Sequence, residues 1–289
     1  KMQILANGLI QGLLLSIISL GFALVYNSTG ILHIAQGAVF AISPFLLLSF
    51  IQSGVGIPIA IFLTLSISVI LSMLFEFVNH WPLHRRGASD AIHLISSLGI
   101  YIVVIQIIAI IWGNETKVLR AGIDVTYMLS DIIITRSQAL GGIIALFSIM
   151  AFFLWLKKTD SGLKFMALSD NPTQLSLMGY DISRLRLLAF GLSGILTAAA
   201  AMLTAMDIGF DPHGGLSAVL LAIVATIVGG KGSFIGPVIG GMLLGIMRSQ
   251  VVWHASARWQ DAITFLVLVL FLFLMPQGIM GKKGRIETQ

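Results

Sequence analysis

The chain contains no cysteine and few charged residues. Of its 289 residues, 10% are Asp, Glu, Lys or Arg, whereas 57% are hydrophobic. Without cysteine there can be no disulfide, thiolate metal site or thiol nucleophile. A soluble domain carries roughly 25% charged residues, so this chain has too little polar surface to cover a globule in water. The composition therefore predicts that lipid is the solvent for most of the outer surface.

Long apolar runs make up most of the sequence. A membrane-spanning helix needs about 20 mostly apolar residues, and eight runs approach this length: 3–26, 34–52, 57–79, 91–112, 138–156, 184–206, 235–252 and 260–275. A ninth run, 216–228, is shorter and is either half a helix or a span completed by its Gly-rich flank. Because backbone groups in hydrocarbon must satisfy their own hydrogen bonds, we expect helices. The predicted fold class is all-α, a polytopic transmembrane helical bundle of 8–9 spans that forms a single domain over 1–289.

The charges between these runs indicate the sidedness of the loops. Basic residues outnumber acidic ones in three segments: 80–90, 157–186 and 282–289. Loop 113–137 is balanced, and loop 207–215 has two acids and no Lys or Arg. Because cytoplasmic loops are enriched in Lys and Arg, we expect the three basic segments inside and these two loops outside. Nine crossings then put the N-terminus outside and the C-terminus inside. Because the basic residues lie in short loops between apolar runs, we interpret the net charge of +5 as a determinant of topology and not as a sign of nucleic-acid binding.

The largest predicted cytoplasmic loop, 158–183, contains signals for two short helices. Residues 162–170 suit the first helix. Asn171 is suited to cap the second, with Pro172 at its first position, and Gly179 can end it in a left-handed conformation. The apolar side chains of these helices predict either an element that lies on lipid headgroups or one that docks another protein. The residues alone favour neither alternative.

A faint internal symmetry is present. An apolar run, a polar break and a second apolar run extend from Gly12 to Gly37, and again from Gly191 to Gly215. The first break is predicted to be cytoplasmic and the second external, which makes the pattern an inverted repeat of the kind many transporters have. The alternative is coincidence in a low-complexity apolar sequence. The repeat halves would be 2–112 and 184–275.

The segment Gly229 to Ser233 (GGKGS) does not match a phosphate-binding loop. That loop needs Ser or Thr directly after its Lys and a Gly six residues before it, whereas here Gly232 follows Lys231 and Ala225 lies six residues before it. We therefore predict that the chain does not itself hydrolyse ATP and has no catalytic residues. The glycines are expected to permit tight turns and close helix contacts, within the chain or at a subunit interface. They are Gly229, Gly230, Gly232, Gly236 and Gly240.

Polar residues beside the apolar runs are candidates for a translocation pathway, because they are costly in lipid. The candidates flank the break before the second run: Asn27, His33, Gln36 and Gly37. The equally weighted alternative is a buried hydrogen-bond cluster between helices.

Other ionisable residues are expected to serve structural roles. We expect Glu76 at the cytoplasmic interface, paired with Arg85 or Arg86. His80 and His84 have a spacing that metals accept, but they lack a nearby third ligand, so we predict no metal site and no cofactor. Three residues of the external loop are expected to be solvated: Asp207, Asp211 and His213.

Five segments, in order, resemble motifs of one family. Gly30 to Gly37 (GILHIAQG) is similar to the G-x-x-N-F-A-H/Q-G signature of the branched-chain amino acid class of ABC transporter permeases, with His33 in place of Asn and Ile34 in place of Phe. The other four similar segments are 82–86 (PLHRR), 162–181 with Met166 where Arg is usual, 229–240 (GGKGSFIGPVIG) and 276–281 (PQGIMG).

The resemblance implies a multi-pass permease subunit of an ABC importer in the bacterial inner membrane. It implies as partners a second homologous permease, two cytoplasmic ATPase subunits and a periplasmic or lipoprotein substrate-binding protein, besides membrane lipid. The implied substrates are branched-chain or other amino acids, urea or short amides. The implied ATPase-coupling residues are Gly162, Lys164, Met166, Asp170, Leu175 and Gly179.

Three rival functions stay open at this point. One is a monosaccharide permease of the related ABC class. Another is an ion-coupled secondary transporter, which would normally need an ionisable residue at the bilayer centre, and no residue is a convincing match. The third is a membrane enzyme, which would need clustered His, Asp or Glu, whereas the acids here are scattered.

Overall fold

The computed structural model describes residues 2–119, 124–129, 132–275 and 277–281. In this part of the chain, six helical segments are long and apolar enough to cross a membrane. They are α1 (Met2–Thr29), α3 with its continuation (Ile57–Arg85), α5 (Asp90–Trp112), α6 (Arg136–Lys158), α9 (Ile182–Ile208) and α12 with the turn before it (Ala257–Leu274). Two shorter apolar helices are α2 (Gln36–Gln52) and α10 (Gly214–Gly229). The helix α11 (Gly236–His254) packs beside them. The prediction of a polytopic helical membrane protein is confirmed.

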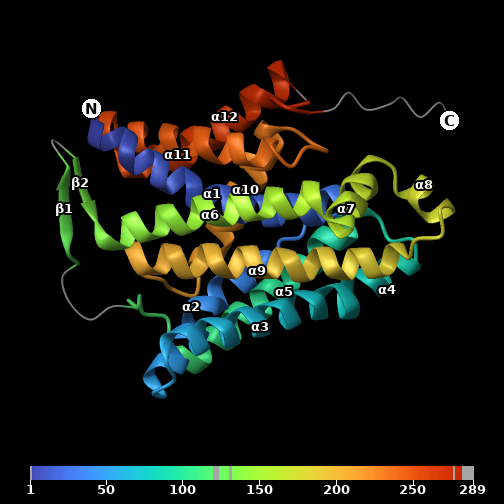
Figure 1. Cartoon of the computed structure of the whole chain (residues 1–289), viewed down its shortest axis with the longest axis horizontal. Coiled ribbons are helices and arrows are strands. Elements are labelled where there is room, and N and C mark those ends of the chain that lie inside the picture. The colour runs from blue at the N-terminus through green and yellow to red at the C-terminus, as the bar shows by residue number, and fades with distance from the viewer. Residues whose placement is uncertain (1, 120–123, 130–131, 276, 282–289) are drawn as a thin grey trace.

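Two pairs of elements mark the opposite ends of the bundle. The strands β1 (Thr126–Leu129) and β2 (Ile132–Thr135) form an antiparallel hairpin near the start of α1, whereas α7 (Asp160–Asp170) and α8 (Pro172–Leu177) lie at the other end (Figure 1). The short helix α4 (Trp81–Arg85) lies at the same end as α7 and α8. Two of the three basic segments thus share one end, and the third, 282–289, lies outside the described residues.

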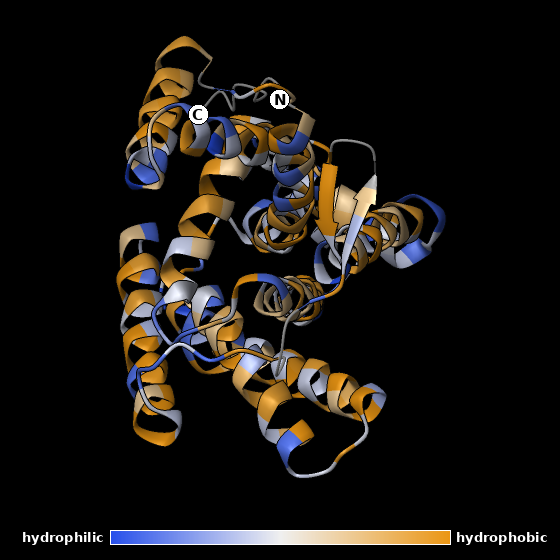
Figure 2. Ribbon diagram, turned by 90° about the vertical axis from the view of Figure 1, so that its left-hand side faces the viewer, coloured by the Kyte–Doolittle hydropathy of each residue, from blue (hydrophilic) through white to orange (hydrophobic). Residues whose placement is uncertain are grey.

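The outer surface carries large apolar side chains. Phe62 on α3, Ile110 on α5 and Phe273 on α12 are 68%, 82% and 85% exposed. The helices at the periphery are coloured as hydrophobic along most of their length (Figure 2). Monomeric soluble proteins rarely expose large contiguous apolar patches, so this surface fits the lipid environment predicted from composition.

The centre of the bundle is built around α1, whose most apolar stretch is 72% buried. It packs closely along α11 because both helices have small residues at the contact. A Cβ at Gly12 would lie 2.9 Å from the Cα of Met242, and one at Gly241 would lie 2.6 Å from the Oγ of Ser16. The small residues of α11 therefore serve packing within the chain, the first of the two alternatives left open by the sequence.

Local signals set the ends of several helices. Thr135 and Gln138 form a capping box at the start of α6. The side chain of Asn171 accepts a hydrogen bond of 3.0 Å from the backbone N–H of Gln174, and Gly179 has a φ of +85° after α8. The two short helices predicted in loop 158–183 are confirmed, with the predicted cap and stop.

Candidate functional site

The α7–α8 element combines a buried face with an exposed apolar face. Phe165 and Leu168 of α7 are almost fully buried, whereas Leu177 and Met178 at the end of α8 are 83% and 73% exposed. The hydroxyl of Thr159 accepts a hydrogen bond of 3.1 Å from the backbone N–H of Gly162 and starts α7. The element is therefore anchored to the bundle while it presents two large apolar side chains outward.

Gly162 and Lys164 have defined contacts within this element. A Cβ at Gly162 would lie 2.5 Å from the Cα of Leu156 at the end of α6, so only glycine permits this approach of α7 to α6. The ammonium of Lys164 lies 5.1 Å from the centre of the Tyr180 ring, within the range of a cation–π contact.

Four more of the expected coupling residues lie close by. Leu175 is buried, at 4% exposure, and Gly179 occupies the left-handed turn. Met166 and Asp170 line a hollow of about 160 Å³, whose other wall is the segment 232–235. The helix α7 and the Gly-rich turn, far apart in sequence, therefore line the same hollow.

The end of α1 holds the Gly-rich turn. The side chain of Asn27 donates a hydrogen bond of 3.3 Å to the backbone oxygen of Ser233 and accepts one of 3.1 Å from the N–H of Gly232. The ammonium of Lys231 lies 5.0 Å from the centre of the Tyr26 ring. Asn27 thus bridges the turn on both sides, a contact that the sequence did not reveal.

The C-terminal motif joins the same region. Ile279 donates a backbone hydrogen bond of 2.9 Å to Val228, and Met280 donates one of 2.8 Å to Gly229. Gly230 has a φ of +117°, and a Cβ there would meet the backbone of Gly281. Two motifs that are separate in the sequence therefore form one compact unit at the end of α10.

The remaining glycines set helix contacts. A Cβ at Gly236 would lie 2.5 Å from the backbone oxygen of Gly229, and one at Gly240 would meet the backbone oxygen of Ala225. Gly232 has a φ of +77° with open space around it. The expected packing and turn roles of these glycines agree with this geometry.

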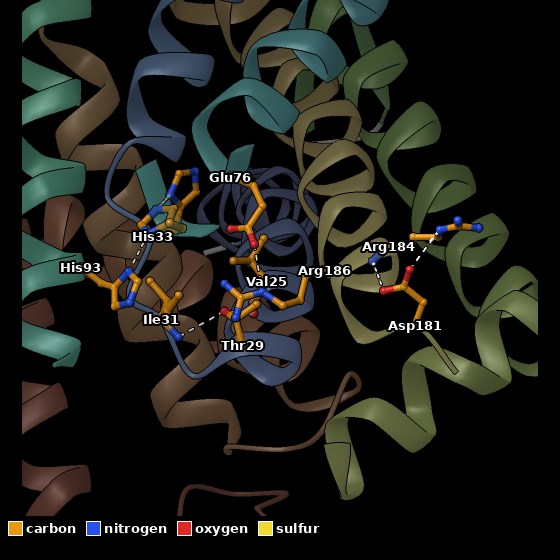
Figure 3. A network of polar contacts seen from close by, with 10 residues as sticks. Val25, Thr29, Ile31, His33, Glu76, His93, Asp181, Arg184 and Arg186 are labelled. Atoms are coloured by element: carbon orange, nitrogen blue, oxygen red, sulfur yellow. Dashed lines mark hydrogen bonds and ion pairs between the residues drawn. The ribbon is translucent and has the colours of Figure 1, made fainter. Parts of the chain in front are cut away.

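A buried ion pair joins α9 to the continuation of α3. The Nε of Arg186 lies 2.8 Å from the Oε1 of Glu76, and the two side chains are only 5% and 3% exposed (Figure 3). The expected pairing of Glu76 with Arg85 or Arg86 at the interface is therefore wrong. Glu76 begins a π-helical turn, Glu76–His80 (η1), and its carboxylate lies toward Arg186 of α9.

Three histidines form a hydrogen-bonded chain beside this pair. The Nδ1 of His33 lies 3.0 Å from the Nε2 of His80, and the Nδ1 of His80 lies 3.1 Å from the Nδ1 of His93 (Figure 3). All three rings are buried, whereas His84 is exposed. His80 therefore pairs with histidines of other segments and not with His84. The described residues contain no group of three or more His, Cys, Asp or Glu with the geometry of a metal site.

Gln36 ties the start of α2 to two other helices. Its Nε2 donates hydrogen bonds of 3.2 Å to the backbone oxygen of Ile18 on α1 and of 2.7 Å to the hydroxyl of Thr197 on α9. Both His33 and Gln36 thus belong to buried hydrogen-bond clusters, the second alternative weighed for these residues.

The next residue, Gly37, lies at the crossing of α2 and α10. A Cβ at Gly37 would lie 2.7 Å from the backbone oxygen of Gly215, and one at Gly215 would meet the backbone oxygen of Gly37. The hydroxyl of Tyr101 accepts a hydrogen bond of 3.1 Å from the N–H of Leu216 beside this crossing.

A cavity with two adjoining parts opens toward the hairpin end of the bundle. The two parts measure about 260 and 310 Å³. They share the lining residues Phe40, Thr204, Ile208, Ala218, Leu221 and Arg248. We call this space the outer cavity. Asp207 lies in the wall of the outer cavity, so it is not simply the solvated loop residue that the sequence predicted. Asp211 caps the next turn, because its carboxylate accepts a hydrogen bond of 2.8 Å from the backbone N–H of His213.

The architecture defines a polytopic helical membrane protein whose outer surface is apolar and whose short helices α7 and α8 present exposed apolar side chains at one end. A family model described as "Branched-chain amino acid transport system / permease component" matches residues 4–272. The chain belongs to this family of permease components.

Relatives cover nearly the whole chain. It is 25% identical over 295 residues to the high-affinity branched-chain amino acid transport system permease protein LivH of Salmonella typhimurium, covering 97% of this chain and 96% of the relative. It is 25% identical over 296 residues to the corresponding protein BraD of Pseudomonas aeruginosa, with the same coverage. The autoinducer 2 import system permease protein LsrC of Escherichia coli is 28% identical over 270 residues, covering 90% of this chain and 75% of the relative.

A solved structure has a similar fold. PsaBC from Streptococcus pneumoniae in complex with Fab includes a chain that matches with a TM-score of 0.50 at 15% identity, covering 95% of this chain and 92% of that chain. At this identity the likeness concerns the fold alone.

Sequence reasoning missed Arg186 and Arg248. Both are arginines at an end of a long apolar helix, and an ionisable residue within such a helix is by itself a signal of function. In the sequence Arg186 lies among the charges of the loop before α9, and Arg248 belongs to none of the motifs.

Proposed function

We propose that this chain forms half of the translocation pathway of an ABC importer in the bacterial inner membrane. Its substrate would be a branched-chain amino acid or another small polar solute, such as a different amino acid, urea or a short amide. Transport would be driven by ATP hydrolysis on separate subunits, so the permease itself is not an enzyme. The match of the family model to residues 4–272 carries this proposal.

Nine crossings with the N-terminus outside and the C-terminus inside account best for the helices. In support, α4, α7 and α8 lie at one end and the β1–β2 hairpin at the other (Figure 1). The helix α10 has 16 residues and is about 24 Å long at 1.5 Å per residue, against a hydrocarbon core of about 30 Å. It would cross together with the Gly-rich turn that follows it.

An inverted repeat with halves 2–112 and 184–275 fits the crossing of α2 and α10. In the sequence pattern Gly37 corresponds to Gly215, and each would place a Cβ against the backbone oxygen of the other. Such reciprocal contacts arise where a two-fold axis passes between equivalent positions. This reciprocity supports the repeat over coincidence. Both halves belong to one permease domain over 1–289.

The loop 158–183 would couple ATP hydrolysis to movement of the helices. A partner ATPase would bind the exposed side chains of Leu177 and Met178, and Gly162 would hold α7 against α6. The loop leads directly into α9, and Arg186 near the start of α9 is paired with Glu76. A displacement of the loop would therefore reach α9 and the continuation of α3 together. Lys164, Met166, Asp170, Leu175 and Gly179 would shape this element.

The four pathway candidates would act by fixing the walls of the pathway. Gln36 and Gly37 hold the start of α2 against α9 and α10, and residues of both of these helices line the outer cavity. His33 would fix the turn before α2, and Asn27 the Gly-rich turn. That any of them touches the substrate stays a prediction.

The partners would be a second homologous permease, two cytoplasmic ATPases and a periplasmic or lipoprotein substrate-binding protein. A second candidate substrate class is a monosaccharide, the rival that the sequence left open, and a further candidate is autoinducer 2, because the autoinducer 2 import system permease protein LsrC is 28% identical over 270 residues. Uptake of leucine, urea and ribose by the purified complex separates these classes.

The testing experiment is affinity purification of the tagged chain from its native host, followed by reconstitution in liposomes. We expect two ATPase polypeptides and a second permease to co-purify, and leucine uptake to require ATP. A chain that purifies alone and transports without ATPases would refute the proposal.

A matched pair of variants tests the docking element. Leu177→Glu should weaken ATPase association and uptake, whereas Met128→Glu adds the same charge to a 76% exposed residue at the hairpin end and should leave uptake unchanged. These variants are cleaner than changes at Gly162, where any Cβ would meet the backbone of Leu156 and disturb packing. Normal uptake by the complex that carries Leu177→Glu would refute the proposed role of α8 in coupling.

A further inference from the structure

A hollow of about 160 Å³ lies between the end of α6, the helix α7 and the segment 232–235. We call it the α7 hollow. Along α6 its wall changes from apolar to basic, from Phe153 through Leu156 to Lys157 in the last turn of this membrane-spanning helix. Water molecules occupy about 30 Å³ each, so the hollow has room for one small polar group, and the rest of any ligand must lie outside it.

The polar side chains of the α7 hollow are one cation, one anion and hydroxyls. Lys157 and Asp170 are the charged residues among those that line it. The Oγ of Ser169, which also lines it, is buried and has no hydrogen-bond partner among the described residues. Buried hydroxyls are normally hydrogen-bonded, so this group points to a ligand. The carboxylate of Asp170 can accept a further hydrogen bond in addition to the interaction it already has.

Two helix ends of opposite polarity border the α7 hollow. The helix α7 ends at Asp170, and α11 begins at Gly236, directly after the segment 232–235. Ser233 caps α11, because its hydroxyl accepts a hydrogen bond of 3.1 Å from the backbone N–H of Gly236. A helix C-terminus favours a cation and an N-terminus favours an anion. The helix ends and the two charged side chains therefore match a group that carries both a positive and a negative charge.

An exposed apolar stripe on α6 leads away from the α7 hollow. Its members Phe147, Met150 and Leu154 are 66%, 52% and 49% exposed. Their spacing of three and four residues places them on the same face of α6 as Lys157. At 1.5 Å per residue, Phe147 lies about 15 Å from Lys157 along the helix axis, which is half of a hydrocarbon core of about 30 Å. The stripe therefore has the length of the acyl region of one leaflet.

From these observations we propose that the α7 hollow binds the headgroup of a phosphatidylethanolamine. Lys157 and the hydroxyl of Ser169 donate hydrogen bonds to its phosphate, and Asp170 accepts one from its ammonium. The acyl chains lie along the stripe of α6. Phosphatidylcholine has the same net charge, but its quaternary ammonium has no N–H to donate. The lipid is a structural ligand between α7 and the Gly-rich turn, separate from the solute that is transported.

Native mass spectrometry of the purified full chain in detergent measures the binding of single lipids. The probes are phosphatidylethanolamine, phosphatidylcholine and phosphatidylglycerol with identical palmitoyl and oleoyl chains. We expect the apparent Kd of phosphatidylethanolamine to be about tenfold lower than that of either other lipid, because each of these lacks the charge-assisted hydrogen bond to Asp170. Equal affinity for phosphatidylethanolamine and phosphatidylcholine overturns the assignment of the headgroup.

Variants at two neighbouring lysines form a matched pair. Lys157→Gln should weaken the binding of all three lipids about tenfold, because each carries the phosphate. Lys158→Gln removes the same charge from a residue that does not line the hollow, and it should leave binding unchanged. Both lysines are exposed, so neither change should affect folding. Asp170→Asn should remove the preference for phosphatidylethanolamine over phosphatidylcholine. Unchanged binding in Lys157→Gln overturns the site.

Two further probes decide between a bound lipid and its alternatives. A phosphatidylethanolamine with a photoreactive diazirine on one acyl chain should cross-link to residues 147–154 of α6. Cross-links spread evenly over α3, α5 and α12 would show general contact with surrounding lipid only, and would overturn the proposal. Glycerophosphoethanolamine has the same headgroup without acyl chains, and it should not displace the lipid at equal concentration. Displacement would assign the hollow to a soluble phosphate ester and overturn the lipid. Neither uptake nor ATP hydrolysis enters these measurements, so their failure is distinct from failure of the proposed function.

Discussion

Removal of either Glu76 or Arg186 alone should destabilise the fold, because each leaves the other charge buried without its partner. Both side chains are almost fully buried and meet at 2.8 Å. Removal of one partner of a buried pair costs about 3–5 kcal/mol, because the other charge is left uncompensated. We therefore expect Glu76→Gln to lower the free energy of unfolding by about 3–5 kcal/mol.

The two single changes should differ. A carboxylate left alone can take up a proton and become neutral, whereas a guanidinium stays charged in proteins. Arg186→Met should therefore cost less than Glu76→Gln, and its cost should shrink as the pH falls.

The double change Glu76→Leu with Arg186→Met should recover most of the loss. One oxygen of Glu76 and one nitrogen of Arg186 have no hydrogen-bond partner among the described residues, so the pair is only partly satisfied. Replacement of a buried pair by apolar residues of similar volume is often neutral or stabilising. The double variant should therefore be within about 1 kcal/mol of the natural chain.

The assay is unfolding of the purified chain in mixed micelles by added dodecyl sulfate, followed through its five tryptophans. Arg184 serves as the matched control, because its pair with Asp181 has side chains 86% and 52% exposed, and Arg184→Met should be near neutral. Single changes that each cost under about 1 kcal/mol, or a double change that costs their sum, would refute the reasoning.

Further predictions concern close contacts that use the same unfolding assay. Gly37→Ala would place a Cβ 2.7 Å from the backbone of Gly215 and should lower the free energy of unfolding by about 1–3 kcal/mol. The control is Gly99→Ala in α5, where a Cβ meets nothing within 4 Å, and this change should raise the free energy of unfolding by up to about 1 kcal/mol. Equal effects of the two changes would contradict the close crossing of α2 and α10. Asn27→Ala loses both hydrogen bonds to the Gly-rich turn and should cost about 1–2 kcal/mol. Faster hydrogen exchange of the Gly232 backbone amide in this variant would show that the loss of stability arises at the Gly-rich turn. Unchanged exchange would show that the turn is stable without Asn27.

The sequence alone determined the long helices of the fold. Each apolar run became a helix within a few residues of its predicted ends, since helix formation in lipid depends on local hydrophobicity and on backbone hydrogen bonds within one segment. The cap at Asn171 and the left-handed turn at Gly179 were likewise predictable, because their partners lie within a few residues. The motif order identified the family before any contact was known.

Only the tertiary structure decided which polar side chains meet. Glu76 pairs with Arg186, 110 residues away, and not with the nearby Arg85 or Arg86, because its carboxylate lies against α9 in the packed bundle. The sequence likewise did not predict the hairpin in loop 113–137 or the cavity around Arg248. Uniformly apolar helices carry little periodicity to mark their inward faces, so the rotation of each helix, and with it the chemistry of the sites, follows from packing between distant segments.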